Sequence, residues 1–327
     1  MKLTTGLNPY GLTYYLGLQG MGTPRQNPNG AGLEGFIALT EELGGKAIEL
    51  WEGWFKDMSD AELAALKDRL DKLGWKRVLS SGLLHCDMDL LLRSAKALDA
   101  KFVRLALTPI LCGDRVAAGA RWDELVNEVN EKLAEYAPRA EAAGVVLLIE
   151  NHQDFTSHEL VAFCDKYGPS VRIVFDMANT FPVAESPIDF TRVIAPYVRH
   201  CHAKDYRAQF TDDGIRLVRC PSGDGCVPFK EMFEILGQHN DEMTACIEIG
   251  ALEARHVKFY HADWWKGYAP KQASALAACL LAARRNHIPE GEEWRTPWER
   301  EADDELIDYE LGQYRRAAEN LKSLGLM

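Results

Sequence analysis

The sequence lacks the features that would place the protein at a membrane or outside the cell. Within its 327 residues, no apolar run approaches the roughly 20 residues that span a bilayer. Residues 1–8 lead directly into strand-like sequence, without the apolar core of a signal peptide. The eight cysteines form no Cys-x-x-Cys pair and are scattered, several within apolar segments, as is typical of reduced, buried thiols. We therefore expect a soluble, cytoplasmic protein with no membrane partner.

Basic charge is also scarce. Lys and Arg number 37 against 49 Asp and Glu, which gives a formal net charge of −12. A duplex-binding protein needs a basic face to displace counterions, and no cluster of Lys and Arg supplies one here. The composition therefore disfavours nucleic acid and favours a small-molecule partner that is neutral or cationic.

What the chain has throughout is an alternation of strand-like and helix-like segments. The predicted strands are 3–10, 47–51, 77–84, 102–107, 145–150, 171–176, 198–202 and 244–249. Several are apolar along their whole length, which is typical of a parallel sheet covered on both faces. We expect an α/β fold in which residues 1–250 close into a (β/α)₈ TIM barrel. Between the last two strands, Gly214, Pro221, Gly223 and Gly225 predict a polar loop, followed by a helix over 229–238.

Residues 251–327 are too many for one helix that closes the barrel. We expect a closing helix and a helical extension packed on the barrel, with helices over 271–285 and 303–323. The aromatic segment 259–265 precedes them. It either packs the extension against the barrel, or forms an aromatic wall over the site or a contact with another subunit.

Four predicted strands end in side chains that can bind a metal: Glu150, Asp176, His202 and Glu248. Because the carboxyl ends of parallel strands meet on the face where such barrels build their sites, we expect these side chains to converge. Three carboxylates and one imidazole suit a divalent cation of intermediate hardness. Mn²⁺ is the first choice, with Mg²⁺, Co²⁺ and Zn²⁺ as alternatives.

The sequence around these positions resembles the xylose-isomerase-like TIM-barrel superfamily of sugar phosphate isomerases and epimerases. The resemblance rests on Ile149-Glu150-Asn151-His152, Phe175-Asp176-Met177-Ala178-Asn179, His202-Ala203-Lys204-Asp205 and Ile247-Glu248, and more weakly on Gly6-Leu7-Asn8, Ile48-Glu49-Leu50-Trp51 and Gly223-Asp224-Gly225. It covers about residues 3–250 and implies a TIM barrel with Glu150, Asp176, His202 and Glu248 on one Mn²⁺-type ion. It extends to the larger subunit of C-glycoside deglycosidases, which act on 3-keto glycosides with a histidine base and a small second subunit.

The expected chemistry is removal of a proton next to the carbonyl of a keto sugar or keto glycoside. A divalent ion makes such a C–H bond more acidic, and a nearby carboxylate or imidazole can take the proton. Glu150 and Glu248 are the expected acid–base pair of an isomerase or epimerase. His152 points the same way as Glu150 if the strand continues, so it is either a second base or a histidine bonded to a loop carbonyl. As a separate base it would suit elimination of the aglycone from a 3-keto C-glycoside.

Six further residues are expected to bind the substrate: Asn8, Glu49, Trp51, His85, Arg104 and Asn151. For Arg104 a structural salt bridge is an equal alternative. His200 is expected to lie deeper in the core, and Lys204 and Asp205 in a loop around the site. Two other functions stay open, an abasic-site endonuclease and a non-catalytic scaffold subunit. We expect a homo-oligomer or a complex with a small second subunit.

Overall fold

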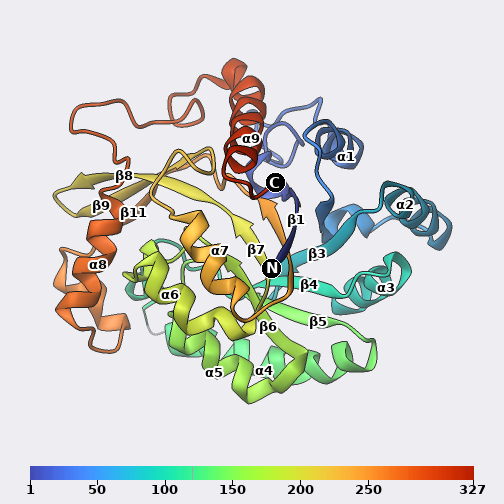
Figure 1. Ribbon diagram of the computed structural model, residues 1–327, viewed down its shortest axis with the longest axis horizontal. Coiled ribbons are helices and arrows are strands. Elements are labelled where there is room, and N and C mark those ends of the chain that lie inside the picture. Colours follow the sequence, from blue (N-terminus) through green and yellow to red (C-terminus); the bar gives the residue numbers. More distant parts are fainter. Residues whose placement is uncertain (120) are drawn as a thin grey trace.

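The computed structural model describes residues 1–119 and 121–327, and its centre is a closed barrel of eight parallel strands (Figure 1). Around the barrel the strands follow the order β1-β2-β3-β4-β5-β6-β7-β10. Their bounds are β1 (Lys2–Leu7), β2 (Ala47–Trp51), β3 (Lys76–Gly82), β4 (Phe102–Ala106), β5 (Val146–Glu150), β6 (Val171–Asp176), β7 (Val198–Ala203) and β10 (Glu242–Ile247). The predicted TIM barrel is confirmed.

Helices surround the barrel, where their apolar faces cover the strands (Figure 1). They are α1 (Gly32–Glu42), α2 (Asp60–Leu73), α3 (Met88–Leu98), α4 (Arg121–Ala142), α5 (Ser157–Tyr167), α6 (Pro187–Ile194), α7 (Phe229–Gly237) and α9 (Leu306–Ser323), while α8 (Ala273–Ala283) lies outside this ring. The local sequence explains their ends. Ser59 and Glu62 form a capping box at the start of α2, and Gly74 ends that helix in the left-handed conformation.

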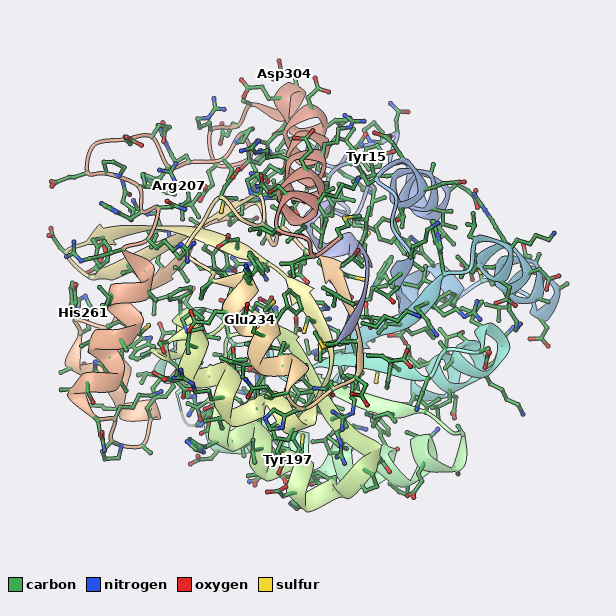
Figure 2. All side chains as sticks on the ribbon, viewed as in Figure 1. Tyr15, Tyr197, Arg207, Glu234, His261 and Asp304 are labelled. Carbon is green, nitrogen blue, oxygen red and sulfur yellow. The ribbon has the colours of Figure 1, made fainter. Side chains whose placement is uncertain are left out.

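The prediction of a polar loop after β7 is wrong, because two further strands form there. β8 (Asp205–Thr211) and β9 (Gly214–Cys220) pair antiparallel, and β11 (Arg255–Val257) adds to the other side of β9. The alternation of Tyr206, Ala208 and Phe210 with polar residues is a strand pattern, which the Gly and Pro residues nearby obscured. This three-stranded sheet extends sideways from the barrel beside α8, on the flank that carries Arg207 and His261 (Figure 2).

The last helix, α9, lies against β1 and β10 and so closes the ring of helices (Figure 1). The hydroxyl of Tyr314 donates to the carbonyl oxygen of Asn8 at 2.7 Å. The carboxylate of Glu310 accepts from the backbone N–H groups of Tyr14 and Tyr15. The C-terminal helix therefore supports the chain just after β1, at the end of the barrel where the predicted ligands lie.

The aromatic segment packs on loops at the carboxyl ends of the strands. The indole of Trp264 donates to the carbonyl of Cys112, and the hydroxyl of Tyr268 donates to the carbonyl of Gly113. Gly113 has φ +63°, and a Cβ there would lie 2.0 Å from the carbonyl oxygen of Pro182, so this contact needs glycine. Trp264 therefore packs this segment on the barrel, in agreement with the first interpretation, and a contact with another subunit stays a prediction.

None of the helices in the described part of the chain is long and apolar enough to cross a bilayer. All eight cysteines are free thiols.

Candidate metal centre

Four neighbouring strands bring the predicted metal ligands together. Glu150, Asp176 and His202 lie at the ends of β5, β6 and β7, and Glu248 directly follows β10. Each side chain offers one ligand atom, and these atoms lie within 4.8 Å of one another. All four residues are buried. The convergence expected from the strand ends is therefore present in the geometry.

The orientation of the His202 ring is fixed from behind by Glu49. Nε2 of His202 lies 2.7 Å from Oε2 of Glu49. Because a carboxylate only accepts, Nε2 carries the proton, and in the neutral ring Nδ1 is left as an acceptor. Glu49 also lies 3.2 Å from Nε2 of His200, whose Nδ1 bonds Thr244 on β10. Glu49, His200 and His202 also meet the distance condition for a metal, but these hydrogen bonds already occupy the facing atoms.

Nδ1 of His202 then faces two more acceptors. It lies 3.0 Å from Oε1 of Glu150 and 3.0 Å from Oε2 of Glu248. Oε2 of Glu248 is buried and accepts no hydrogen bond from the described residues. Burial lowers the pKa of His202, but the surrounding carboxylates outweigh this effect and hold the pKa well above its ordinary value. The position between these acceptors therefore favours a positive charge, either a proton on the ring or a metal cation.

Lys204 supplies a positive charge from the other side. Its Nζ donates to Oδ2 of Asp176 and to Oε1 of Glu248, both at 2.8 Å. Gly250 makes room for it, because a Cβ there would lie 2.6 Å from Cε of Lys204. The lysine was expected in a loop around the site, but it contacts two of the four predicted ligands directly. Its position two residues beyond His202 on an extended strand was the available signal.

Arg104 neutralises the remaining side of the cluster. Its guanidinium donates to Oε2 of Glu150 and to the carbonyl of Ser81, and it lies 4.8 Å from the centre of the Tyr10 ring. Burial raises the pKa of Glu150, but Arg104 together with His202 and His152 outweighs this effect, and the pKa falls to about 2. Of the two alternatives for Arg104, the structure shows the salt bridge.

Charge in this interior is still unbalanced toward negative. Four buried carboxylates, Glu49, Glu150, Asp176 and Glu248, face the two cationic side chains of Lys204 and Arg104. Burial and the neighbouring carboxylates raise the pKa of Asp176 to about 7, although Lys204 opposes them. A divalent cation would balance the two remaining negative charges. The donor set, its spacing and its charge therefore fit such an ion.

Asn151 and Asn179 hold Asp176 in place. The side-chain amide of Asn151 donates to the carbonyl of Asp176 and accepts from its N–H, at 2.8 and 2.7 Å. Nδ2 of Asn179, which the sequence reasoning did not single out as functional, donates to Oδ2 of Asp176 at 2.7 Å. Neighbours of this kind fix the direction of a metal ligand.

His152 lies beside the cluster without joining it. Its Nδ1 is buried and has no hydrogen-bond partner in the described chain, so the loop-carbonyl bond expected as one alternative is absent. Burial lowers the pKa of His152 to about 4, with Glu150 opposing this shift and Arg104 and Lys204 adding to it. The ring is therefore neutral at physiological pH, which is the form that can accept a proton.

The residues expected to bind substrate fall into two groups. Glu49 and Asn151 bond the predicted ligands, and Nδ2 of Asn8 lies 3.3 Å from Nε2 of His202. Glu49 and Asn151 are placed to position ligands, whereas Asn8 is a neighbour of His202 without a hydrogen bond to it, because its Nδ2 and the protonated Nε2 are both donors. Trp51 is half-buried and packs edge-on against Trp54, and His85 is exposed in the turn after β3. Neither is brought to the four ligands.

Comparisons with known proteins agree with this architecture. The model of a protein family described as xylose isomerase-like TIM barrel matches residues 37–268. Among curated proteins, the chain is 27% identical over 220 residues to the uncharacterized protein YihM of Escherichia coli (strain K12). That match covers 64% of this chain and 64% of YihM, so it spans slightly less than two thirds of this relative.

Solved structures share the fold at low sequence identity. An L-ribulose 3-epimerase aligns with a TM-score of 0.56 and 18% identity, over 90% of this chain and 88% of its own. A D-psicose 3-epimerase determined in the presence of D-fructose aligns with a TM-score of 0.53 and 18% identity, over 100% and 99% of the two chains. At this level of identity, the likeness shows the fold.

Proposed function

Since the chain belongs to the xylose isomerase-like TIM-barrel family, we propose that it is a metal-dependent enzyme of the sugar isomerase and epimerase type. The proposed reaction removes a proton from the carbon next to the carbonyl of a keto sugar or keto glycoside. The observation that carries this proposal is the meeting of Glu150, Asp176, His202 and Glu248, with Nδ1 of His202 aimed at two carboxylates.

The proposed cofactor is one divalent ion held by Glu150, Asp176, His202 and Glu248, with Mn²⁺ as the first choice. Bound there, such an ion supplies a Lewis acid that makes the C–H bond next to a carbonyl more acidic. Because the surrounding charges would be balanced by the ion, a neutral, oxygen-rich substrate suits the site better than a phosphate ester.

The proton is assigned to Glu150 and Glu248. They come from β5 and β10, the outer two of the four neighbouring strands, so they flank the space between them. Arg104 and Lys204 each bond one of these carboxylates and keep it charged, while Glu49 holds the His202 ring. A carboxylate on either side can remove the proton and return it, as isomerisation or epimerisation requires.

A second reaction is favoured by His152. Its neutral ring, whose buried Nδ1 has no partner among residues 1–119 and 121–327, offers a base that is separate from the predicted ligands. A base that does not return the proton suits elimination, such as loss of the aglycone from a 3-keto C-glycoside. Elimination would use the same metal ion as isomerisation and would begin with the same removal of a proton next to the carbonyl.

The experiment is hydrogen exchange in D₂O. The protein is incubated with Mn²⁺ and each member of a panel of neutral keto sugars and 3-keto glycosides, and deuterium next to the carbonyl is measured by NMR and mass spectrometry. We expect exchange with at least one substrate, and its loss in Glu150→Gln and Glu248→Gln. Glu310→Gln is the matched control, because Glu310 is also buried but lies on α9. Release of an aglycone that depends on His152 would favour elimination, and no exchange or release across the panel would contradict the proposal.

A further inference from the structure

Arg255 carries a charge on a face of the three-stranded sheet that otherwise packs in the core. In β11 it lies opposite Leu217 of β9, and Leu217 lies opposite Ala208 of β8. Residues that lie opposite one another in antiparallel strands point to the same side of the sheet. Leu217 and Ala208 are fully buried in the main hydrophobic core, so the side chain of Arg255 begins on the core side. The next residue, His256, lies on the outer side against Trp294.

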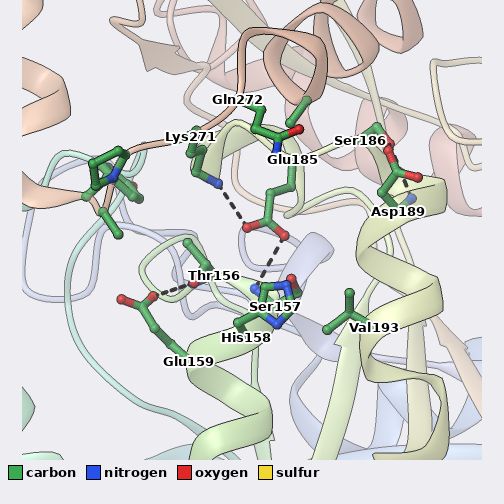
Figure 3. A pocket seen from close by; sticks show the side chains of 14 residues that line it. Thr156, Ser157, His158, Glu159, Glu185, Ser186, Asp189, Val193, Lys271 and Gln272 are labelled. Carbon is green, nitrogen blue, oxygen red and sulfur yellow. Dashed lines mark hydrogen bonds and ion pairs between the residues drawn. The ribbon is translucent and has the colours of Figure 1, made fainter.

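The guanidinium of Arg255 has no partner in the described part of the chain. The side chain is partly buried, it forms neither a hydrogen bond nor an ion pair there, and its Nε is buried without an acceptor. Comparable cations do have partners. Arg219, on the same face of the sheet, donates to the carbonyl of Gly11. In the hollow between α5, α6 and α8, Nζ of Lys271 lies 2.9 Å from a carboxylate oxygen of Glu185 (Figure 3). Because an unpaired charge withdrawn from water is costly, Arg255 indicates an acceptor that the chain itself does not supply.

One side of Arg255 borders the loops after β4 and β5. Burial raises the pKa of the Cys112 thiol, and the charge of Arg255 and the backbone N–H of His256 both oppose this shift, so both lie close to the thiol. The N–H of Cys112 donates to Oε1 of Gln153 at 2.8 Å. Gln153 directly follows His152, so this side of Arg255 leads to the candidate base.

The other side of Arg255 faces Tyr206 and, through it, the candidate metal centre. Burial raises the pKa of Tyr206 to about 12, and Arg255 is among the charges close enough to oppose this shift. The hydroxyl of Tyr206 donates to Oδ1 of Asn179 at 3.3 Å, and Nδ2 of Asn179 bonds Asp176. Arg255 therefore lies between the surroundings of Asp176 and those of His152, at the carboxyl end of the barrel. It is partly exposed whereas the four predicted ligands are buried, which places it toward the solvent.

We propose that Arg255 binds a carboxylate at the end of the substrate that is distant from the reacting carbonyl. The inference rests on the proposed function, because it assigns a second contact to the same substrate. A guanidinium can bond both oxygens of a carboxylate at once. One unpaired cation balances the single charge of a carboxylate, whereas a phosphate ester carries nearly two. The part of the substrate at the metal stays neutral, and the preferred substrate is a keto sugar acid or a keto glycoside of one.

The first test compares keto sugars that differ only in this group. D-Fructuronate with D-fructose, D-tagaturonate with D-tagatose, and a 3-keto glucuronide with the matching 3-keto glucoside each differ by a carboxylate in place of a hydroxymethyl group. In the D₂O exchange assay with Mn²⁺, we expect kcat/KM to be at least about tenfold higher for the acid in at least one pair.

Variants of Arg255 identify the source of this preference. Arg255→Gln should raise KM for the acid at least about tenfold at nearly unchanged kcat, and leave kcat/KM for the neutral sugar within about twofold. Arg255→Lys should restore part of the preference, because it keeps the charge without the planar guanidinium. Lys258→Gln is the matched control, since it removes an exposed cation three residues further along the chain and should leave the preference unchanged.

Equilibrium binding separates a failure of this inference from a failure of the proposed reaction. Calorimetry with the Mn²⁺-loaded protein measures the affinity for both members of each pair, whether or not they react. Tighter binding of the acid that Arg255→Gln abolishes supports the role of Arg255, even if no exchange is seen and the proposed reaction is refuted. Equal affinity for both members of every pair, undetectable binding included, or a preference that persists in folded Arg255→Gln would overturn the inference. Exchange with the neutral sugars would then still support the proposed function.

Discussion

Replacing Glu49 by Gln should weaken Mn²⁺ binding although Glu49 is not a predicted ligand. Oε2 of Glu49 holds Nε2–H of His202 at 2.7 Å and leaves Nδ1 facing Glu150 and Glu248. Glutamine has a similar shape, but its amide oxygen is a weaker acceptor and its NH₂ group cannot accept. The ring would lose both its fixed tautomer and the negative charge behind it.

The size of the effect follows from similar contacts in metal proteins. Loss of a hydrogen-bond partner behind a metal-binding histidine costs roughly 10- to 100-fold in affinity, or about 1.4–2.7 kcal/mol. Both residues are fully buried, so water cannot replace the lost acceptor. We therefore expect the upper half of this range for Glu49→Gln.

Isothermal titration calorimetry with Mn²⁺ measures the change, and circular dichroism checks that the variant is folded. Glu310→Gln is the matched control, because it also changes a buried carboxylate into an amide but lies outside the barrel cluster. Its Mn²⁺ affinity should equal that of the wild type. If folded Glu49→Gln also binds Mn²⁺ like the wild type, His202 does not bind the metal in the way described.

Three further changes have distinct expected results. Lys204→Met removes a cation that bonds two predicted ligands. The melting temperature in the presence of a chelator should therefore fall, and Mn²⁺ binding measured by calorimetry should become at least about tenfold tighter. Weaker Mn²⁺ binding would contradict this prediction. His152→Asn should lower turnover about 10²- to 10⁴-fold at unchanged Mn²⁺ affinity if His152 is the base, whereas near-normal turnover would eliminate that role. Burial raises the pKa of Glu310 from 4.5 to about 7, so the folded protein holds this proton more tightly and stability should fall as pH rises between these values. Urea unfolding at pH 5 and pH 8 measures this fall in the free energy of unfolding, and Glu310→Gln should remove up to about 3 kcal/mol of it. An equal pH dependence in the wild type and Glu310→Gln would refute the prediction.

The barrel could be predicted from the sequence because its strands are short, wholly apolar segments between helical ones. β2 and β6 have the predicted bounds, and the other barrel strands differ by a few residues at their ends. The β8–β9 hairpin was missed because Gly214, Pro221 and Gly223 were given more weight than the alternation of apolar and polar residues before them. Gly214 is the first residue of β9, directly after the two-residue turn that joins the strands, so the glycine was compatible with a hairpin.

The convergence of the four predicted ligands could be predicted from the sequence, because the carboxyl ends of the strands determine where such side chains lie. The roles of their neighbours were not accessible in the same way. Glu49 reaches His202 across 153 positions of sequence, and Asn8 directly follows β1, which lies two strands away from β7 around the barrel. Such contacts depend on the rotamers of the side chains in the barrel interior, and no local sequence pattern predicts them. Lys204 is the exception, since its spacing from His202 already placed it on the same side of the strand.

The most direct test of the central claim is the position of Mn²⁺ itself. Crystals grown or soaked with MnCl₂ and measured for anomalous scattering would locate the ion. The account predicts one strong peak per chain, bonded to Glu150, Asp176, Glu248 and Nδ1 of His202, with the ammonium of Lys204 moved from between Asp176 and Glu248. A saturated crystal with no peak among these four side chains, or with Mn²⁺ bound only elsewhere, would contradict it.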